Sequence, residues 1–307
     1  MSFVLGTSLL AVVTALACAL PGVFIVLRKN SMLVDAISHA VFPGIVVGYL
    51  FSRDLDSPIL VAGAALAGLL VVLGSEWLSR TGLITGDAPQ GLVFPALFSI
   101  GVILITMNFS NVHLDTHTVL VGDLNLASFE QFTVQGTPVA PVYLVLMLGV
   151  LALNVGFIAA LYPRLAASTF DPEFARSLGI RTGVLNAGLM LLVAVTVTAA
   201  FNAAGAILVV ALVIAPPATA LLVTRRLPAM IALTLAIAAF GAIVGFWIAY
   251  WLDAPTSASM AIWYGVMFLA TLVISGGVRR RGARSGVGAA IHQRHPHRIG
   301  SGTTQGN

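Results

Sequence analysis

Apolar runs of about 20 residues recur along this chain, and they constrain its fold more than any other feature. A helix needs about 20 apolar residues to cross a bilayer, so the sequence predicts about eight or nine membrane helices. The expected spans are Phe3–Leu27, Met32–Phe51, Ile59–Leu78, Gln90–Met107, Val139–Leu161, Val184–Ala200, Ala206–Val223, Pro228–Trp251 and Ser257–Ser275. Only 8% of the residues are charged, against about 25% in soluble domains. We therefore predict an all-α fold, a polytopic membrane helical bundle.

The basic residues give the orientation of this bundle. When the spans alternate in direction, Arg53 is the only one of 15 Lys and Arg residues on its side. The positive-inside rule makes the other side cytoplasmic. The runs Val184–Ala200 and Ala206–Val223 could be two full spans or a shorter broken pair, and either preserves this orientation. The polar stretch His113–Glu130 then faces outward, where it is either a weak metal collector or a solvated loop.

The remaining composition excludes several classes of protein. A single cysteine, Cys18, excludes an intrachain disulfide. The net charge of +4 comes from cations at helix ends and in the C-terminal segment, a pattern of membrane topology rather than of nucleic-acid binding. Lys29 is the only lysine and follows Arg28, so no G-x-x-x-x-G-K phosphate loop exists. With no catalytic motif either, we expect a chain that is not an enzyme and binds no nucleic acid.

We predict two parts along the chain. Residues 1–277 form the membrane domain, and residues 278–307 form a disordered, basic cytoplasmic tail. This tail begins with the run RRRGAR and contains His292, His295 and His297. Those histidines could bind metal or could belong to a basic tail without a ligand.

One acidic residue and one histidine stand inside the second apolar run, in the stretch SMLVDAISHAVFPG from Ser31 to Gly44. Asp35 and His39 are four residues apart and therefore share one face of a helix, which we expect to break near Pro43-Gly44. An aspartate at membrane depth costs roughly 2.5–3.5 kcal/mol, so it should face a cavity, a partner or a ligand.

Three interpretations of this pair are open. It could be a hydrogen bond that holds two helices together, a proton relay, or a site for Mn, Fe or Zn, which carboxylate and imidazole suit. Two ligands are too few for a tight metal site. A symmetric dimer would bring two such pairs to one axis and supply four.

Three blocks of sequence resemble the permease subunits of ABC importers for manganese, zinc or iron, the ABC-3 family. They are DAISHAVFPG at Asp35–Gly44, FDPEFARSLGI at Phe170–Ile180 and ALVIAPPATALLVTRRLP at Ala211–Pro228. Their order and spacing match the family over nearly all of the membrane part. The resemblance implies a fold similar to the vitamin B12 and siderophore importers and a location in the bacterial inner membrane. It also implies a homodimer, two cytoplasmic ATPase subunits and an external metal-binding protein.

The same resemblance implies roles for individual residues. In the family the D-A-x-x-H-A block contributes to the metal path, so Asp35 and His39 become metal-contacting residues. The segment after Pro216-Pro217 is similar to the family's coupling loop. It assigns ATPase contact to Thr219, Thr224, Arg225, Arg226 and Pro228, and Phe170–Arg181 could share that contact. Within that second segment, Asp171-Pro172-Glu173 is typical of a helix start, with proline at the first position and acids in the first turn. The metal is cargo, no permanent cofactor is expected, and its identity does not follow from the resemblance.

Two other functions remain as hypotheses. A stand-alone, proton-coupled metal transporter or channel would use Asp35–His39 as a proton relay. A structural membrane subunit would have no pathway of its own. The cytoplasmic segments discriminate between them, because a permease needs an ATPase partner and an exposed docking segment at Arg225-Arg226, and a secondary transporter needs neither.

Overall fold

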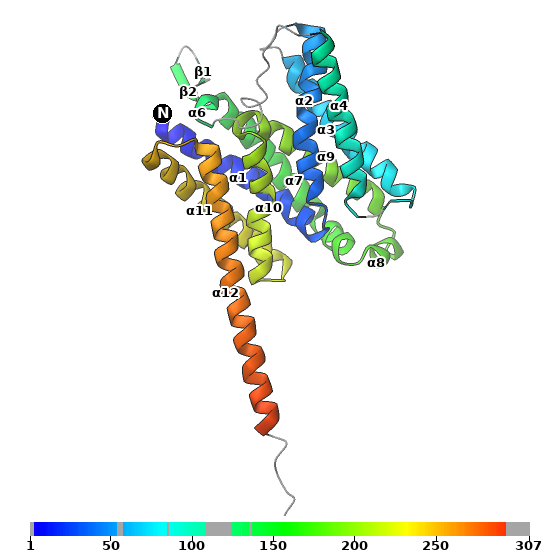
Figure 1. Cartoon of the computed structure of the whole chain (residues 1–307), viewed down its shortest axis with the longest axis vertical. Coiled ribbons are helices and arrows are strands. Elements are labelled where there is room, and N and C mark those ends of the chain that lie inside the picture. Colours follow the sequence, from blue (N-terminus) through cyan, green and yellow to red (C-terminus); the bar gives the residue numbers. More distant parts are fainter. Residues whose placement is uncertain are drawn as a thin grey trace, which may run out of the picture.

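The computed structural model describes residues 3–53, 58–84, 86–108, 124–129, 131–134 and 137–292 (Figure 1). Nine helices in this part of the chain are long and apolar enough to cross a membrane. These helices are α1 Phe3–Leu27, α2 Met32–Ser52, α3 Pro58–Arg80, α4 Ala88–Asn108, α7 Val142–Phe170, α9 Thr182–Ala204, α10 Ala206–Val223, α11 Leu227–Leu252 and α12 Thr256–His292. The predicted all-α membrane bundle is therefore confirmed.

Short elements fill two of the connections. The one before α7 contains α6 Leu124–Ala127 and an antiparallel hairpin of β1 Gln131–Val134 and β2 Thr137–Pro141. The helix α8 Pro172–Ser177 lies between α7 and α9. Because the hairpin reaches Pro141, α7 begins at Val142 rather than at the predicted Val139. It also continues past Leu161 to Phe170, through Pro163.

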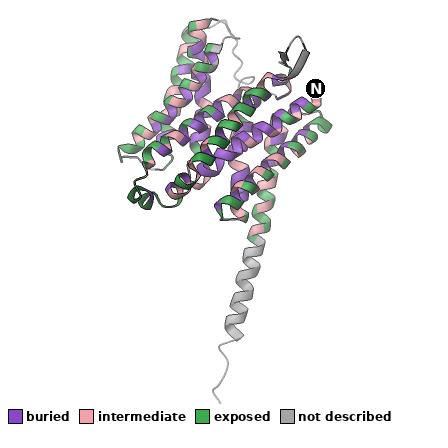
Figure 2. Ribbon diagram, turned by 180° about the vertical axis from the view of Figure 1, so that it is seen from behind, coloured by how far each residue is buried: buried purple, intermediate pink, exposed green. Residues whose placement is uncertain are grey.

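The first helix forms the centre of the bundle. It packs against α7, α10 and α11, and buried positions run along most of its length (Figure 2). Alanines are frequent on its buried surface, and small side chains let neighbouring membrane helices approach closely. The central helix is thus packed by protein on several sides, which leaves the outer helices to meet lipid or a partner.

The second helix lies between α3 and α4 in very close contact. A Cβ atom added to Gly44 would lie 2.5 Å from the carbonyl oxygen of Gly63 on α3, and one added to Gly101 on α4 would lie 2.6 Å from Cβ of Pro43. The expected break near Pro43-Gly44 is wrong, because α2 runs unbroken from Met32 to Ser52. Packing on both sides holds the helix together through its proline.

The sequence left open whether α9 and α10 are two full spans or a shorter broken pair, and the residue between them bears on this question. Gly205 has φ 78° and ψ 162°, a backbone conformation that is readily available only to glycine. It separates helices of 23 and 18 residues, each long enough to be a full span. The structure thus favours two spans over a shorter broken pair.

The last helix extends beyond the predicted membrane domain. The helix α12 continues to His292, whereas the disordered tail was predicted to begin at residue 278. Residues 278–292 contain no proline, so nothing in their backbone blocks helix continuation. Residues 293–307 lie outside the described part of the chain, and the division into a domain and a tail stays a prediction.

Candidate functional site

Asp35 and His39 project from the same face of α2, as the sequence predicts. Nε2 of His39 lies 3.5 Å from Oδ1 of Asp35, and the two side chains are 36% and 42% exposed respectively. This separation is longer than a good hydrogen bond of about 2.7–3.2 Å. Both residues belong to one helix, so they do not form the His–Asp link between two helices that one interpretation required. The pair is accessible and loosely joined, as a site that accepts a third partner should be.

The fourth helix holds the histidine ring in place. The ring of His39 stacks on Phe94, with centroids 5.5 Å apart and planes 21° apart, and meets the edge of Phe98 at 6.4 Å. Pro43 has no N–H to donate to the carbonyl of His39 four residues earlier, so that oxygen loses its usual helical partner. A carboxylate, an imidazole and a backbone carbonyl therefore come from two turns of one helix.

This donor set is incomplete for a tight metal site in one chain. Across the described residues, no group of three or more His, Cys, Asp or Glu side chains is placed to hold a metal ion. The sequence candidates His113, Asp115 and His117 lie outside the described residues, as do His295 and His297 in the tail. Any further ligands for Asp35 and His39 must come from water, another backbone oxygen or a second copy of the chain.

The predicted ATPase-contacting residues divide into two groups. Thr219 is buried inside α10, where its hydroxyl donates to the carbonyl of Ala215 at 2.7 Å. Thr224 follows the last residue of α10, and Arg225, Arg226 and Pro228 are exposed where α11 begins. The structure therefore brings four of the five residues to one short surface segment and separates Thr219 from it.

The second cytoplasmic segment has a well-formed helix start. Oδ1 of Asp171 accepts a hydrogen bond from the backbone N–H of Phe174 at 2.9 Å, with Pro172 at the first position of α8. This arrangement confirms the helix start predicted at Asp171-Pro172-Glu173. Phe170 and Phe174 are exposed beside it. Phe170 also lines a pocket of about 420 Å³ with Arg225, so the two segments predicted to be cytoplasmic meet at this pocket.

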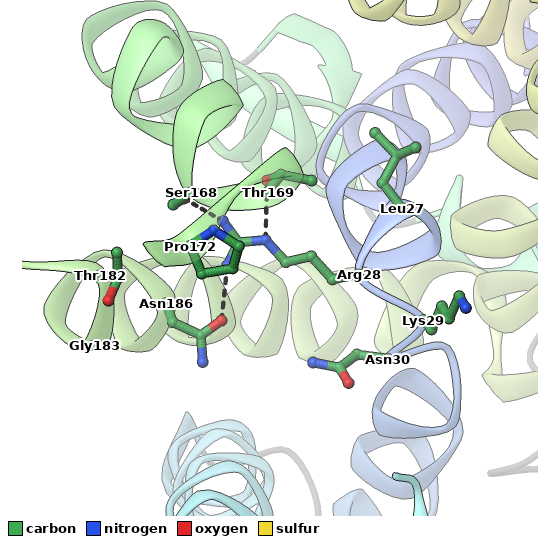
Figure 3. Close-up of a pocket in the computed structure, with 10 residues that line it drawn as sticks. All are labelled: Leu27, Arg28, Lys29, Asn30, Ser168, Thr169, Pro172, Thr182, Gly183 and Asn186. Atoms are coloured by element: carbon green, nitrogen blue, oxygen red, sulfur yellow. Dashed lines mark hydrogen bonds between the residues drawn. The ribbon is translucent and has the colours of Figure 1, made fainter. Parts of the chain in front are cut away.

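Sequence reasoning missed a hydrogen-bond network around Arg28, which it treated only as a topological cation. This guanidinium donates to Thr169, Asn186 and Ser168 at 3.1, 2.8 and 2.9 Å, and dashed lines mark these hydrogen bonds in Figure 3. Burial lowers the pKa of Arg28 because desolvation disfavours its charged form. The network joins the residue after α1 to the C-terminal end of α7 and the N-terminal part of α9. Nδ2 of Asn186 in turn donates to Oε2 of Glu76 on α3 at 3.2 Å.

Comparison with known proteins adds a family match to this geometry. Residues 1–275 match the model of the ABC 3 transport family. The zinc transport system membrane protein TroD of Treponema pallidum is 44% identical over 275 residues, which cover 89% of this chain and 75% of TroD. The manganese transport system membrane protein MntD of Bacillus subtilis is 38% identical, with 90% and 93% covered. In the solved structure of PsaBC from Streptococcus pneumoniae, one chain aligns with a TM-score of 0.70 at 27% identity, over 88% of this chain and 91% of that one.

Proposed function

Because this chain belongs to the ABC 3 transport family, as a metal transporter permease of the bacterial inner membrane, we propose that it forms the pathway of an ATP-driven importer for a divalent transition metal. Its cargo is Mn²⁺, Zn²⁺ or Fe²⁺. The observation that carries the proposal is the half-exposed Asp35–His39 pair on a membrane helix, with its imidazole oriented by Phe94. Asp35 lies in the first turn of α2, and ionisable residues within membrane helices are typical of ion pathways.

The chemistry of the pair supports transport rather than storage. Carboxylate and imidazole together suit Mn, Fe and Zn, and a site for cargo must bind weakly enough to release it. Two copies of the chain would offer two such pairs across a symmetric interface. In this proposal an external metal-binding protein delivers the ion, and opening and closing of the dimer interface passes it inward.

Separate ATPase subunits supply the energy in this proposal. They dock on the cytoplasmic surface formed by α8 and the segment from Thr224 to Pro228. Exposed apolar side chains beside exposed cations support this assignment, because contiguous apolar patches on a polar surface are typical of interaction sites. Thr219 is left out of this docking surface because it is buried.

The test is metal uptake in bacterial cells that lack their own importers. The chain is expressed with its neighbouring ATPase and binding protein, and Mn²⁺, Zn²⁺ and Fe²⁺ are compared with and without a Walker-motif mutation in the ATPase. We expect uptake of at least one metal that depends on an active ATPase. Uptake that persists with the inactive ATPase would favour the proton-coupled transporter, in which Asp35–His39 relays protons.

A further inference from the structure

A small polar chamber lies at the cytoplasmic ends of α2, α3, α4 and α9. Its volume is about 60 Å³, and its polar lining consists of Asn30, Ser75, Glu76, Ser79, Gln90 and Asn186. A water molecule needs about 10–15 Å³ measured in this way, so the chamber has room for several waters or a partly hydrated ion. It is separate from the Asp35–His39 pair, and the proposed function gives it no role.

Two side chains in this chamber have polar atoms without a partner. Ser75 is 3% exposed and Gln90 is 8% exposed. Neither Oγ of Ser75 nor Oε1 of Gln90 makes a hydrogen bond to any described residue. Leaving a buried polar atom unpaired costs about 1–3 kcal/mol, so such atoms in a native protein usually serve a ligand or water. Both atoms are oxygens that can bind a cation.

The charge in the chamber comes from Glu76. One carboxylate oxygen accepts from Nε of Arg80 at 3.2 Å, and the other accepts from Nδ2 of Asn186 at 3.2 Å. The side chain of Arg80 is 64% exposed, and an exposed ion pair of this kind contributes only about 0–1 kcal/mol. An arriving divalent cation can therefore displace Arg80 at little cost.

The orientation of Asn186 separates the chamber from the nearby Arg28. The amide oxygen of Asn186 accepts from Arg28 at 2.8 Å in the neighbouring pocket (Figure 3). Its NH₂ group is thereby turned toward Glu76. The guanidinium of Arg28 already donates to three side chains, so its hydrogen-bonding capacity is directed away from Glu76.

The chamber lies at the end of the bundle where α2 and α4 begin, one turn of α4 away from the Asp35–His39 pair. Gln90 precedes Phe94 by one turn on the same face of α4, and Phe94 stacks on His39. On α2, Leu33 lines the chamber from a different face of the helix than the one that carries Asp35 and His39. The link between the pair and the chamber therefore runs along α4, from Phe94 to Gln90.

We propose that this chamber is a second cation site, which receives the divalent metal after it leaves Asp35 and His39. Its ligands are the carboxylate of Glu76, Oε1 of Gln90 and Oγ of Ser75, completed by water. An all-oxygen set suits Mn²⁺ better than Zn²⁺, which favours imidazole and thiolate. One carboxylate with two arginines nearby makes a weak site, as release into the cytoplasm requires. The place of this site in transport rests on the proposed function.

The test measures Mn²⁺ binding to the purified full-length chain by electron paramagnetic resonance. The chain carries Asp35→Ala and His39→Ala, so that only other sites contribute. We expect weak Mn²⁺ binding that Glu76→Gln reduces tenfold or more, although glutamine keeps an oxygen for Asn186. Gln90→Glu adds a second carboxylate and should tighten Mn²⁺ binding tenfold or more. Asp253→Asn, an exposed carboxylate between α11 and α12, is the matched control and should change nothing.

The outcomes separate the chamber from the proposed function. Mn²⁺ binding that is unaffected by both Glu76→Gln and Gln90→Glu would overturn the second site and leave the chamber as a water pocket. If Glu76→Gln does not fold, Ser75→Ala, which removes a hydroxyl that has no partner, must weaken Mn²⁺ binding several-fold. Unchanged binding in that variant would also overturn the site. Normal uptake by cells carrying Asp35→Ala would instead refute the proposed function while the binding result for the chamber stands.

Discussion

Two sets of polar side chains in the membrane part of this protein show opposite relations to their surroundings. Arg28 makes three hydrogen bonds of 2.8–3.1 Å to residues on α7 and α9. Asp35 and His39 lie seven or more residues further on, remain half exposed, and are 3.5 Å apart. The first set has used its bonding capacity to join helices. The second retains capacity that a cargo ion can use.

The comparison teaches where to look for function in a bundle made almost entirely of apolar helices. A polar group in a membrane helix costs free energy unless it is satisfied. A polar group that makes hydrogen bonds to neighbouring helices, such as Arg28, has a structural role in holding those helices together. An accessible and loosely paired group, such as Asp35, needs a ligand to explain it. The following changes test that distinction, from the largest expected effect to the smallest.

Removing either member of the accessible pair should abolish transport and leave the fold intact. We expect Asp35→Ala or His39→Ala to lower metal uptake by about 100-fold or more, since loss of even an outer partner of a metal site costs 10–100-fold. The thermal unfolding temperature in detergent should barely change, because the pair is loosely joined. Met32→Ala, an exposed side chain at the start of α2, is the control. Near-normal uptake in both variants would place the ion path elsewhere.

Reversing the exposed charges at the start of α11 should uncouple the ATPase. Arg225→Glu with Arg226→Glu should reduce ATPase co-purification and uptake by roughly tenfold, which corresponds to about 1.4 kcal/mol of interface energy. The stability of the permease itself should stay the same, because both side chains are exposed. Arg53→Glu on the outer side is the matched control. Full co-purification of the double variant would argue that docking uses α8 alone.

Removing Arg28, which makes three hydrogen bonds, should lower the stability of the protein, in contrast to the loss of uptake expected at Asp35 and His39. Arg28→Met leaves acceptors on Ser168, Thr169 and Asn186 without their donor, and hydrogen bonds to charged groups contribute about 1.5–3 kcal/mol each. Because hydroxyl groups can turn to other partners, we expect a loss of about 2–4 kcal/mol in the free energy of unfolding, measured by titration with SDS. The exposed neighbour Lys29→Met should stay within about 0.5 kcal/mol. A loss of uptake without loss of stability would make Arg28 a functional residue instead.

Sequence alone predicted the parts of this molecule that depend on local pattern. The membrane helices follow from the length of the apolar runs, and the shared face of Asp35 and His39 follows from their four-residue spacing. The helix start at Asp171-Pro172 likewise needs only three adjacent residues. In each case the structure confirms the prediction because the determining interactions lie within about one helical turn.

The features that sequence did not predict depend on distant partners. Arg28 bonds to residues 140 to 158 positions away, and nothing local marks such a pairing. The predicted break at Pro43 failed because contact between Gly44 and Gly63 supports α2 from a neighbouring helix. Thr219 was expected at a cytoplasmic contact, and α10 spans Ala206–Val223 as predicted, but the side chain of Thr219 is buried. Both misses concern packing against neighbouring helices, which the local sequence does not show.

A change in backbone spacing should have a smaller effect than loss of the arginine. In Gly44→Ala the new methyl group would meet the carbonyl oxygen of Gly63 at 2.5 Å and Cα of Ala64 at 2.6 Å. Since backbone atoms cannot turn aside, α2 and α3 must separate, at a cost of about 1–3 kcal/mol. Gly91→Ala on α4, where no other group lies within 4 Å, should be neutral or slightly stabilising. Equal stability of both variants would show that the α2–α3 contact is looser than its geometry indicates.

The smallest effect is expected from the C-terminal segment. The family match ends at residue 275, and the polar groups assigned here to the metal path and to ATPase docking all precede it. Deletion of residues 278–307 should therefore change metal uptake by less than about twofold, a difference below 0.5 kcal/mol, when uptake is normalised to the amount of protein in the membrane. That normalisation matters, because the deletion removes six arginines that favour cytoplasmic placement of this end. A severe loss of uptake at equal membrane levels would show that histidines or arginines of this segment act on the ion or the ATPase, and the set of functional polar groups would then extend beyond the bundle.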